Sequence, residues 1–287
     1  MPNNRYSIVG FENDNLKCYR NSVVQCLLSC KMVRQQLIIN CEYDEERGNI
    51  KGPSELDRFL FTIMVVAGKI GGTISLDSYI KSHGAYLQGV ESQSTGPACA
   101  MEYFQGIHKN GDDVGICTDL FHMFSLHMVM SGERTSLENS ITKQFEKSVI
   151  KIVSNKEPTP WNLCETVLND NQVAVYHTGY GGDKHDVHEF ATTVMITNPK
   201  MLCICVESPE NLSVPTIMEM SVCKMTQSRE KDKYELCALV MVHEANTPSG
   251  HYIACVKTEK NQWNMVVRLL SAVCICIVLT LLYHWCF

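Results

Sequence analysis

The sequence has no run of lysine and arginine residues, and its acidic residues outnumber its basic ones. The 25 Lys and Arg residues stand against 31 Asp and Glu residues, which gives a formal net charge of −6. A protein that neutralises nucleic-acid phosphates needs a basic face. We therefore expect no nucleic-acid partner, and the composition favours a protein or small-molecule partner.

The pattern of a disulfide-bonded secreted protein is also missing. The 15 cysteines are odd in number and scattered, and several lie in apolar segments such as Cys26–Leu28 and Cys203–Cys205. Such cysteines are typical of core residues in a reducing compartment. The first residues, Met1–Arg5, contain no apolar secretory segment. We therefore expect the body of the chain to lie in the cytoplasm.

Paired Cys-x-x-Cys ligands for a structural zinc are absent as well. His185 and His188, with Cys164 upstream, form the nearest alternative. A structural zinc, however, needs four ligands, usually at paired spacings. The sequence thus predicts no metal and no other cofactor.

Strands and helices do not alternate along the chain, which argues against a doubly wound parallel sheet. Helical patterns fill much of the first half, at residues 18–38, 54–69, 75–83 and 97–108. Short β-rich segments follow in the second half, at residues 172–178, 201–206, 216–224, 234–245 and 251–257. Helices followed by strands predict an α+β fold.

The C-terminal segment Leu269–Phe287 is almost wholly apolar. With about 19 residues it is long enough to cross a bilayer core as a helix. Arg268 precedes it, as the positive-inside bias of membrane anchors requires. We therefore predict a transmembrane helix that attaches the chain to the cytoplasmic face of an intracellular membrane, so that residues 1–264 form one domain and residues 265–287 a tail. The β-branched residues in this segment also suit a buried closing strand, which is the alternative.

Cys18 stands where an Asn-rich segment gives way to the first predicted helix. The amide groups at a helix N-terminus favour the thiolate, which is the nucleophilic form of cysteine. The segment around Cys18 resembles the Cys box of the ubiquitin-specific proteases, Gly-Leu-x-Asn-x-Gly-Asn-Thr-Cys-Tyr-x-Asn, with matches at Gly10, Asn13, Cys18, Tyr19 and Asn21. The resemblance implies that Cys18 is the nucleophile and that the Asn13 amide stabilises the oxyanion. An asparagine that only caps the turn is the alternative interpretation of Asn13.

A cysteine nucleophile needs an imidazole to take and return a proton, and this group comes from elsewhere in the fold. The segment Tyr234–His243, followed after seven residues by Gly250–Lys257, is similar to the His box of the same family. The similarity implies that His251 is the catalytic base. A strand histidine with a purely structural role is the alternative.

Shorter segments between the two boxes keep the order of the family's landmarks. Ala100–Phe104, which includes Glu102, resembles the end of a helix in that family. The resemblance implies a papain-like cysteine protease fold with a helical thumb, an antiparallel β palm and reduced fingers. It further implies a thiol-dependent deubiquitinase, with ubiquitin and ubiquitinated proteins as partners.

The sequence departs from the family pattern in two places. Asn15–Lys17 replaces Gly-Asn-Thr before the nucleophile, and Val267 occupies the place of the acid or amide that orients the histidine. Asn261 and Asn264 are the nearest polar substitutes. A catalytically impaired member that binds ubiquitin or a partner at a membrane is therefore a second hypothesis. A membrane-anchored structural protein is a third.

Overall fold

Helices come first along the chain and strands dominate the rest, in the computed structural model of residues 1–287. The described residues are 10–12, 17–69, 73–82, 100–109, 114–121, 123–131, 141–147, 150–153, 161–162, 174–176, 189–195, 199–207, 212–220, 232–243, 251–258, 262–265 and 272–281. The helices are α1 Cys18–Ser29, α2 Lys31–Asn40, α3 Glu55–Lys69, α4 Leu76–Ser82, α6 Ala100–Lys109 and the π-helix η2 Cys117–Phe121.

The largest sheet has seven strands, in the order β16-β15-β14-β17-β11-β7, with β13 paired to β14 beside this path. Its strands are β7 Ile150–Val153, β11 Met201–Glu207, β13 Ile217–Met220, β14 Asp232–His243, β15 His251–Lys257, β16 Trp263–Met265 and β17 Ala272–Leu281. All its pairings are antiparallel except that of β7 with β11. The predicted α+β class, with an antiparallel sheet late in the chain, is confirmed.

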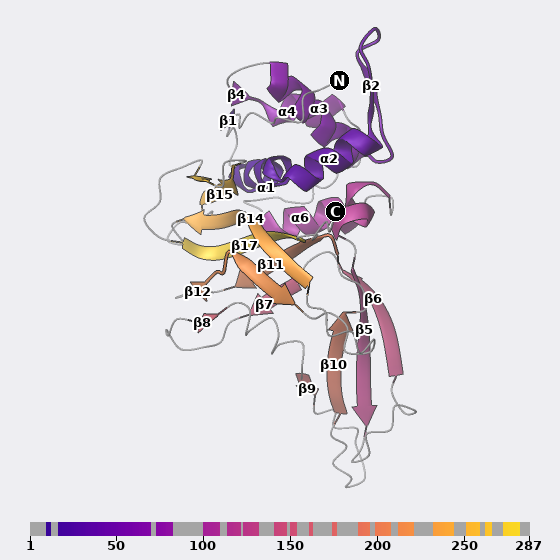
Figure 1. The fold of residues 1–287 in the computed structure, drawn as a ribbon, viewed down its shortest axis with the longest axis vertical. Coiled ribbons are helices and arrows are strands. Elements are labelled where there is room, and N and C mark those ends of the chain that lie inside the picture. Colours follow the sequence, from indigo (N-terminus) through magenta and orange to yellow (C-terminus); the bar gives the residue numbers. More distant parts are fainter. Residues whose placement is uncertain are drawn as a thin grey trace, which may run out of the picture.

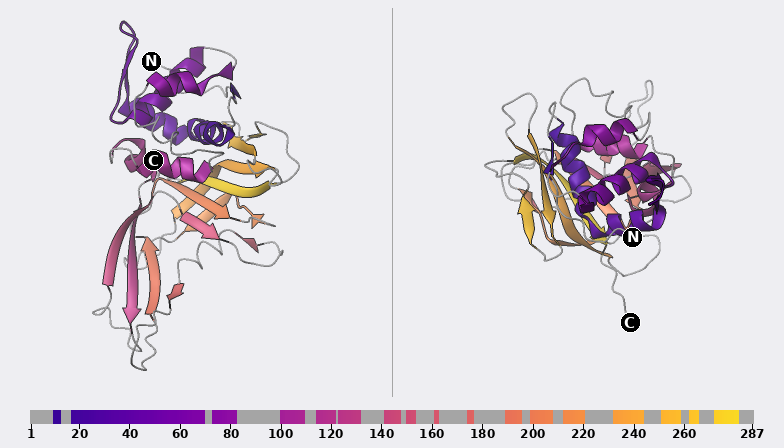
Figure 2. Two further views of the ribbon diagram at one scale, coloured as in Figure 1. Left: turned by 180° about the vertical axis from the view of Figure 1, so that it is seen from behind. Right: turned by 90° about the horizontal axis from the view of Figure 1, so that it is seen from above.

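A second, four-stranded sheet has the order β6-β5-β10-β9. Its strands are β5 Met123–Ser131, β6 Ile141–Lys147, β9 Ala174–Tyr176 and β10 Glu189–Met195. Figures 1 and 2 show the helices at one end of the molecule, the seven-stranded sheet in the middle and the four-stranded sheet extending from the other end. The sequence patterns indicated no strand at β5 or β6.

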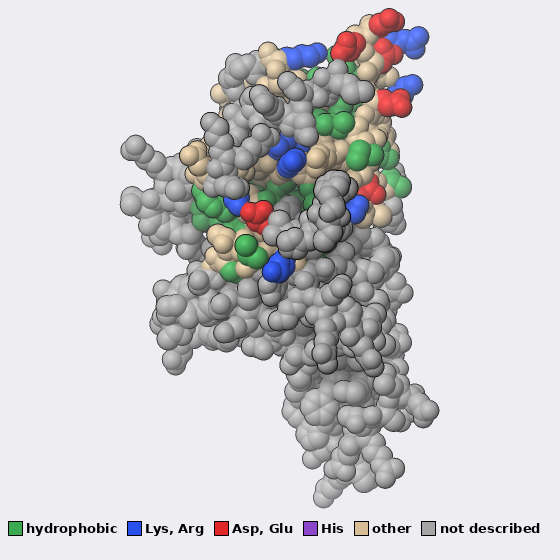
Figure 3. Space-filling view, viewed as in Figure 1, with side chains coloured by type: hydrophobic (Ala, Val, Ile, Leu, Met, Phe, Trp, Pro, Cys, Tyr) green, Lys and Arg blue, Asp and Glu red, His purple; other side chains and the backbone are tan. Residues whose placement is uncertain are grey.

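Three small pairings complete the described strands. β1 Gly10–Phe11 is parallel to β4 Thr73–Ile74, and β8 Trp161–Asn162 is parallel to β12 Leu212–Ser213. β2 Glu42–Asp44 and β3 Asn49–Lys51 form a hairpin whose tip carries charged side chains of both signs (Figure 3). The side chains at this tip are exposed, whereas Tyr43 and Ile50 in its strands pack against the core.

Helix α1 lies at the centre of the helical layer and is buried over nearly its whole length. It packs against β14 and β15 of the large sheet and against α6. The rings of Tyr19 in α1 and Tyr103 in α6 meet edge to face, with their centroids 5.6 Å apart. α1 is therefore enclosed on several sides, and its buried residues include the polar Arg20, Asn21 and Gln25.

The single long helix predicted for residues 18–38 is instead two helices, α1 and α2, which are separated at Cys30. The backbone of Cys30 is extended, with φ −72° and ψ 119°. The Arg34 guanidinium donates hydrogen bonds to the carbonyl oxygens of Leu28, at 3.0 Å, and Ser29, at 2.6 Å. These bonds satisfy carbonyl groups that the end of α1 leaves without helical partners. No Gly or Pro marks the break, so the local sequence gave no signal for it.

The start of α3 agrees with the prediction that Ser54 begins a helix. Ser54 Oγ accepts a hydrogen bond from the Asp57 amide at 3.0 Å and donates one to Asp57 Oδ1 at 2.7 Å. The Asp57 carboxylate is fully buried. It also accepts hydrogen bonds from Asn40 Nδ2 at 2.9 Å and from the Ile116 amide at 3.2 Å. Asp57 thus joins α2, α3 and the segment before η2.

The predicted transmembrane helix at Leu269–Phe287 is wrong for its central part, because Ala272–Leu281 forms strand β17. β17 lies between β14 and β11, with Ile277 opposite Leu239 on one side and Ile204 on the other. Among the helices in the described part of the chain, none has both the length and the hydropathy needed to cross a bilayer.

The reason for this error is that a strand paired on both sides and a membrane helix can share one sequence pattern. Both are continuous apolar runs without alternation. In β17 the backbone amides find partners on two neighbouring strands, and β-branched residues such as Val273 and Ile275 suit that conformation. The alternative of a strand is therefore the correct one for Ala272–Leu281.

Candidate active site

Two segments far apart in the sequence meet at the first turn of α1. Cys18 is the first residue of α1, and its Sγ accepts a hydrogen bond from the backbone amide of Tyr252 at 3.4 Å, across 234 positions of sequence. Tyr252 directly follows His251, which is exposed and begins β15. The structure therefore brings the two residues predicted as nucleophile and base to the same place.

The N-terminal end of α1 suits a negatively charged sulfur. The first amides of a helix have no helical partner and carry a partial positive charge. Lys17 occupies the N-cap position without a side-chain cap, and no acidic residue lies in the first turn. The Cys18 thiol is 8% exposed, so it lies close to the surface and is still shielded from bulk water. The Cys18 sulfur therefore lies at the partly positive end of α1 and accepts a hydrogen bond from the Tyr252 amide.

Comparison with known families supports the same interpretation of this site. The family model described as ubiquitin carboxyl-terminal hydrolase matches residues 9–269. The chain belongs to this family. A search of curated proteins finds no match.

Solved structures of this fold are similar to the chain over almost its whole length. The SAGA DUB module of Ubp8, Sgf11, Sus1 and Sgf73 bound to monoubiquitin has a TM-score of 0.68 at 14% identity and covers 99% of this chain and 71% of that one. The same module bound to ubiquitin aldehyde has a TM-score of 0.71 at 15% identity and covers 98% and 70%. A yeast SAGA DUB module with an Sgf73 mutant has a TM-score of 0.66 at 16% identity and covers 98% and 70%. These similarities show that the chain has the papain-like fold of the hydrolase family.

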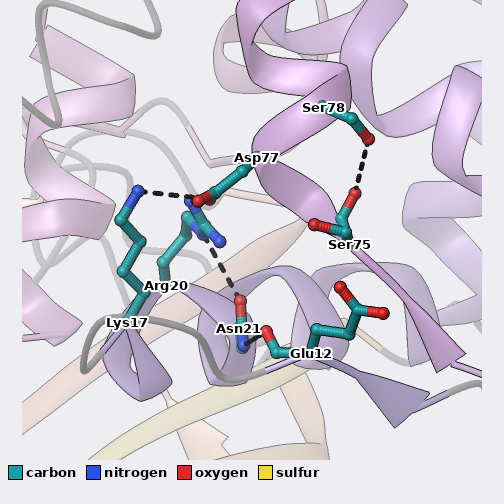
Figure 4. A network of polar contacts seen from close by, with 7 residues as sticks. All are labelled: Glu12, Lys17, Arg20, Asn21, Ser75, Asp77 and Ser78. Carbon is teal, nitrogen blue, oxygen red and sulfur yellow. Dashed lines mark hydrogen bonds and ion pairs between the residues drawn. The ribbon is translucent and has the colours of Figure 1, made fainter.

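An ion-pair network, shown in Figure 4, holds the first turn of α1 in this family member. Asp77 in α4 accepts hydrogen bonds from Arg20 Nη1 at 2.6 Å and from Lys17 Nζ at 3.1 Å. Arg20 is 1% exposed, so its charge depends on a nearby anion. Burial alone raises the pKa of Asp77, but the hydrogen bonds and charges of Arg20 and Lys17 lower it below its usual value. Asp77 therefore anchors the residues on both sides of Cys18 to α4.

This network was not predicted from the sequence. Lys17 replaces the threonine of the family's Cys box, and Asp77 lies 60 positions away. The only local signal was an acidic residue in the first turn of a short helix, which usually indicates a favourable interaction with the helix dipole.

We predict that Asp77→Asn lowers the free energy of unfolding at neutral pH by roughly 1–2 kcal/mol, since it removes one negative charge that pairs with the buried Arg20 guanidinium, while the partial exposure of Asp77 screens the loss. Because the folded-state pKa of Asp77 is lowered, its contribution is present above the unfolded pKa of about 3.9 and is lost as the pH falls through the folded value. Urea denaturation between pH 7 and pH 3 checks this. The difference between wild type and variant should shrink below about pH 4.

The matched control for this prediction is Asp44→Asn. Asp44 forms an exposed ion pair with Arg47 at 3.8 Å, which is worth less than about 0.5 kcal/mol. Equal losses of stability in the two variants would show that the Asp77 network does not hold α1.

The predicted oxyanion donor, Asn13, lies outside the described residues. Its neighbour Glu12 is described and is held from two sides. The Asn21 Nδ2 donates to the Glu12 carbonyl oxygen at 2.9 Å (Figure 4), and the Glu12 amide donates to the Ile74 carbonyl at 3.0 Å. Asn21 is one of the residues that match the Cys box, and this bond gives it a physical role. It ties the segment that leads to Asn13 to the helix that carries Cys18.

Asn264, one of the two polar substitutes considered from the sequence, does not orient His251. Asn264 in β16 is exposed and pairs with Val256, five residues along β15 from His251. At about 3.3 Å per residue this separation is roughly 16 Å, which is too long for a hydrogen bond. Val267 and Asn261 lie outside the described residues.

A metal site was the other kind of site that the sequence raised. Among the described residues, no group of three or more His, Cys, Asp and Glu side chains is arranged to hold a metal ion. His185, His188 and Cys164, the alternative zinc ligands, lie outside the described residues.

Glu102 lies in the first turn of α6, so the helix predicted there is confirmed.

Proposed function

We propose that this family member is a thiol-dependent deubiquitinase that cleaves the bond after the C-terminal glycine of ubiquitin. The observation that carries the proposal is the meeting of Cys18, at the start of α1, with the Tyr252 amide beside His251. The family assignment supports the same chemistry. Two structures similar in fold are described as bound to monoubiquitin and to ubiquitin aldehyde, which supports ubiquitin as the substrate.

In the proposed mechanism Cys18 Sγ attacks the carbonyl carbon of the terminal glycine after His251 has taken the thiol proton. The carbonyl oxygen becomes negatively charged, and Asn13 would donate a hydrogen bond to it. His251 then gives its proton to the leaving amine as the carbon–nitrogen bond breaks. Water, activated by His251, hydrolyses the thioester and restores the Cys18 thiol.

Three other cysteines in the described part of the chain, Cys41, Cys117 and Cys255, are poor nucleophiles compared with a cysteine that is in the thiolate form. Burial, with a smaller contribution from the nearby Asp57 carboxylate, raises the pKa of Cys41 and of Cys117 to about 12. Burial also raises the pKa of Cys255. These thiols stay protonated near neutral pH, and the thiol form reacts slowly. An electrophile that enters the site should therefore react with a cysteine other than Cys41, Cys117 and Cys255.

The proposal is tested with ubiquitin that carries a C-terminal electrophile. We expect one ubiquitin to add to the protein, with the adduct on Cys18 when the digested product is sequenced by mass spectrometry. Cys18→Ala should abolish the adduct, whereas Cys41→Ala should leave it unchanged. Ubiquitin lacking its C-terminal glycines but carrying the same electrophile is the second control. An adduct on another cysteine would overturn the role of Cys18.

The second candidate function is that of a catalytically impaired member that holds ubiquitin without cleaving it. Val267 in the position of the orienting acid and Asn15–Lys17 before the nucleophile favour it. The same experiment separates the two candidates. Binding of fluorescent ubiquitin without formation of the adduct supports the binding module, whereas adduct formation with turnover of a ubiquitin amide supports the enzyme.

A further inference from the structure

Three cysteine side chains lie where α1 packs on β14. Cys30 connects α1 to α2, and its Sγ lies 3.0 Å from the Sγ of Cys237 in β14. Cys26, one helical turn earlier, places its Sγ 3.5 Å from the carbonyl oxygen of Leu239 in the same strand. All three cysteines are free thiols in this structure. Nothing in the proposed catalytic mechanism uses them.

The distance between Cys30 and Cys237 is close to that of a covalent bond. A disulfide has a sulfur–sulfur length of about 2.05 Å, so each sulfur would have to move by only about 0.5 Å. The break between α1 and α2 is what makes this approach possible, because the extended backbone at Cys30 interrupts the helix facing β14. Cys26, by contrast, is directed to a backbone carbonyl of β14.

We propose that Cys30 and Cys237 are a site of reversible oxidation, at which a small-molecule disulfide such as glutathione disulfide converts the two thiols to a Cys30–Cys237 disulfide. Cys237 is the less buried of the two residues, since Cys30 is 2% exposed, so the exchange begins at Cys237. The Cys237 thiolate attacks one sulfur of the oxidant and displaces one thiolate. The Cys30 thiolate then attacks the Cys237 sulfur of the mixed disulfide and displaces the second.

This exchange balances without a further reagent. The two cysteines lose two electrons and two protons, and one molecule of the small disulfide becomes two molecules of its thiol. Burial raises the pKa of Cys237, and the hydrogen bond with Cys30 adds to the effect. The thiolate is therefore scarce near neutral pH, so the exchange is slow.

The bond would cross the interface on which the candidate active site depends. α1 begins with Cys18, and β14 pairs with β15, which begins with His251. The two cysteines are separated by 207 positions, so the crosslink would close a very long loop. It would hold the helix of the nucleophile against the sheet of the base. The formation of the bond does not depend on whether the protein cleaves ubiquitin.

The test uses the full chain, reduced and then incubated with glutathione disulfide. Free thiols are blocked with an alkylating reagent, and the protein is digested without reduction. We expect mass spectrometry to find a linked pair of peptides containing Cys30 and Cys237, lighter by two hydrogens than their sum. Treatment with dithiothreitol should remove this species. Because the wild-type protein is used, the test does not depend on the folding of a variant.

Two variants are the matched comparison. Cys26→Ser should still form the linked peptides, whereas Cys237→Ser should form none and should leave Cys30 available to alkylation only after unfolding. The proposal is overturned if the folded wild-type protein, checked by near-ultraviolet circular dichroism, gains glutathione on other cysteines and forms no Cys30–Cys237 link. A link from Cys26 to either cysteine in place of the expected pair would overturn it as well.

Discussion

His251→Ala is expected to lower kcat/KM for a ubiquitin C-terminal amide by about 10²- to 10⁴-fold, the usual contribution of a positioned general acid and base. His251 begins β15, beside the residue whose amide contacts Cys18 Sγ. In its absence no group described near Cys18 can take the thiol proton and return it to the leaving amine. Since the His251 side chain is exposed, its removal leaves no cavity, and the thermal unfolding midpoint should be nearly unchanged.

His243→Ala is the matched control for this experiment. His243 is the histidine of β14 that pairs directly with His251 in the strand register. We expect its replacement to change kcat/KM by less than about 10-fold, because it would remove no proton-transfer step. Initial rates are measured with a fluorogenic ubiquitin amide. If His243→Ala lowered kcat/KM more than His251→Ala does, the role of the base would have to be assigned to His243 in place of His251.

The candidate site could be predicted from the sequence because its signals are local. A cysteine that begins a helix and a histidine that begins a strand were each recognised from a few neighbouring residues, and the segment 251–257 has the predicted bounds. The partners of these segments were not predicted. The Tyr252 amide, Asp77 and the Asn21–Glu12 bond all depend on which elements meet in space, and a single sequence does not state that.

Two of the errors in the fold have the same origin. β17 was taken for a membrane helix because its apolar run satisfies either a bilayer or two neighbouring strands, and only the position of β11 and β14 distinguishes the two. The break at Cys30 was missed because no Gly or Pro marks it, and the carbonyl groups at the end of α1 are satisfied by the side chain of Arg34. In both cases the backbone groups are satisfied by partners that local propensity does not specify.

The largest expected effect on stability comes from Gly115→Ala. Gly115 has φ 80°, in the left-handed region, and a Cβ built there would lie 2.4 Å from Asp57 Oδ1. The left-handed backbone costs a residue with a Cβ about 1–2 kcal/mol. The clash adds to this, because relieving it pulls the buried Asp57 away from Ser54 and the Ile116 amide. Donors left without partners there cost about 1–3 kcal/mol each.

Gly115→Ala should therefore lower the free energy of unfolding by roughly 3–5 kcal/mol in urea denaturation. Gly48→Ala separates the cost of the left-handed backbone from the cost of the clash. Gly48 also has a positive φ, 62°, but a Cβ there would meet nothing within 4 Å. We expect it to cost only the backbone term of about 1–2 kcal/mol. The double variant Asp57→Ala/Gly115→Ala should be less unstable than the sum of its single variants, because the first substitution removes the atoms that the new Cβ would meet. Equal losses for the two glycine variants, or strict additivity in the double variant, would show that Asp57 does not hold this junction of α2, α3 and η2.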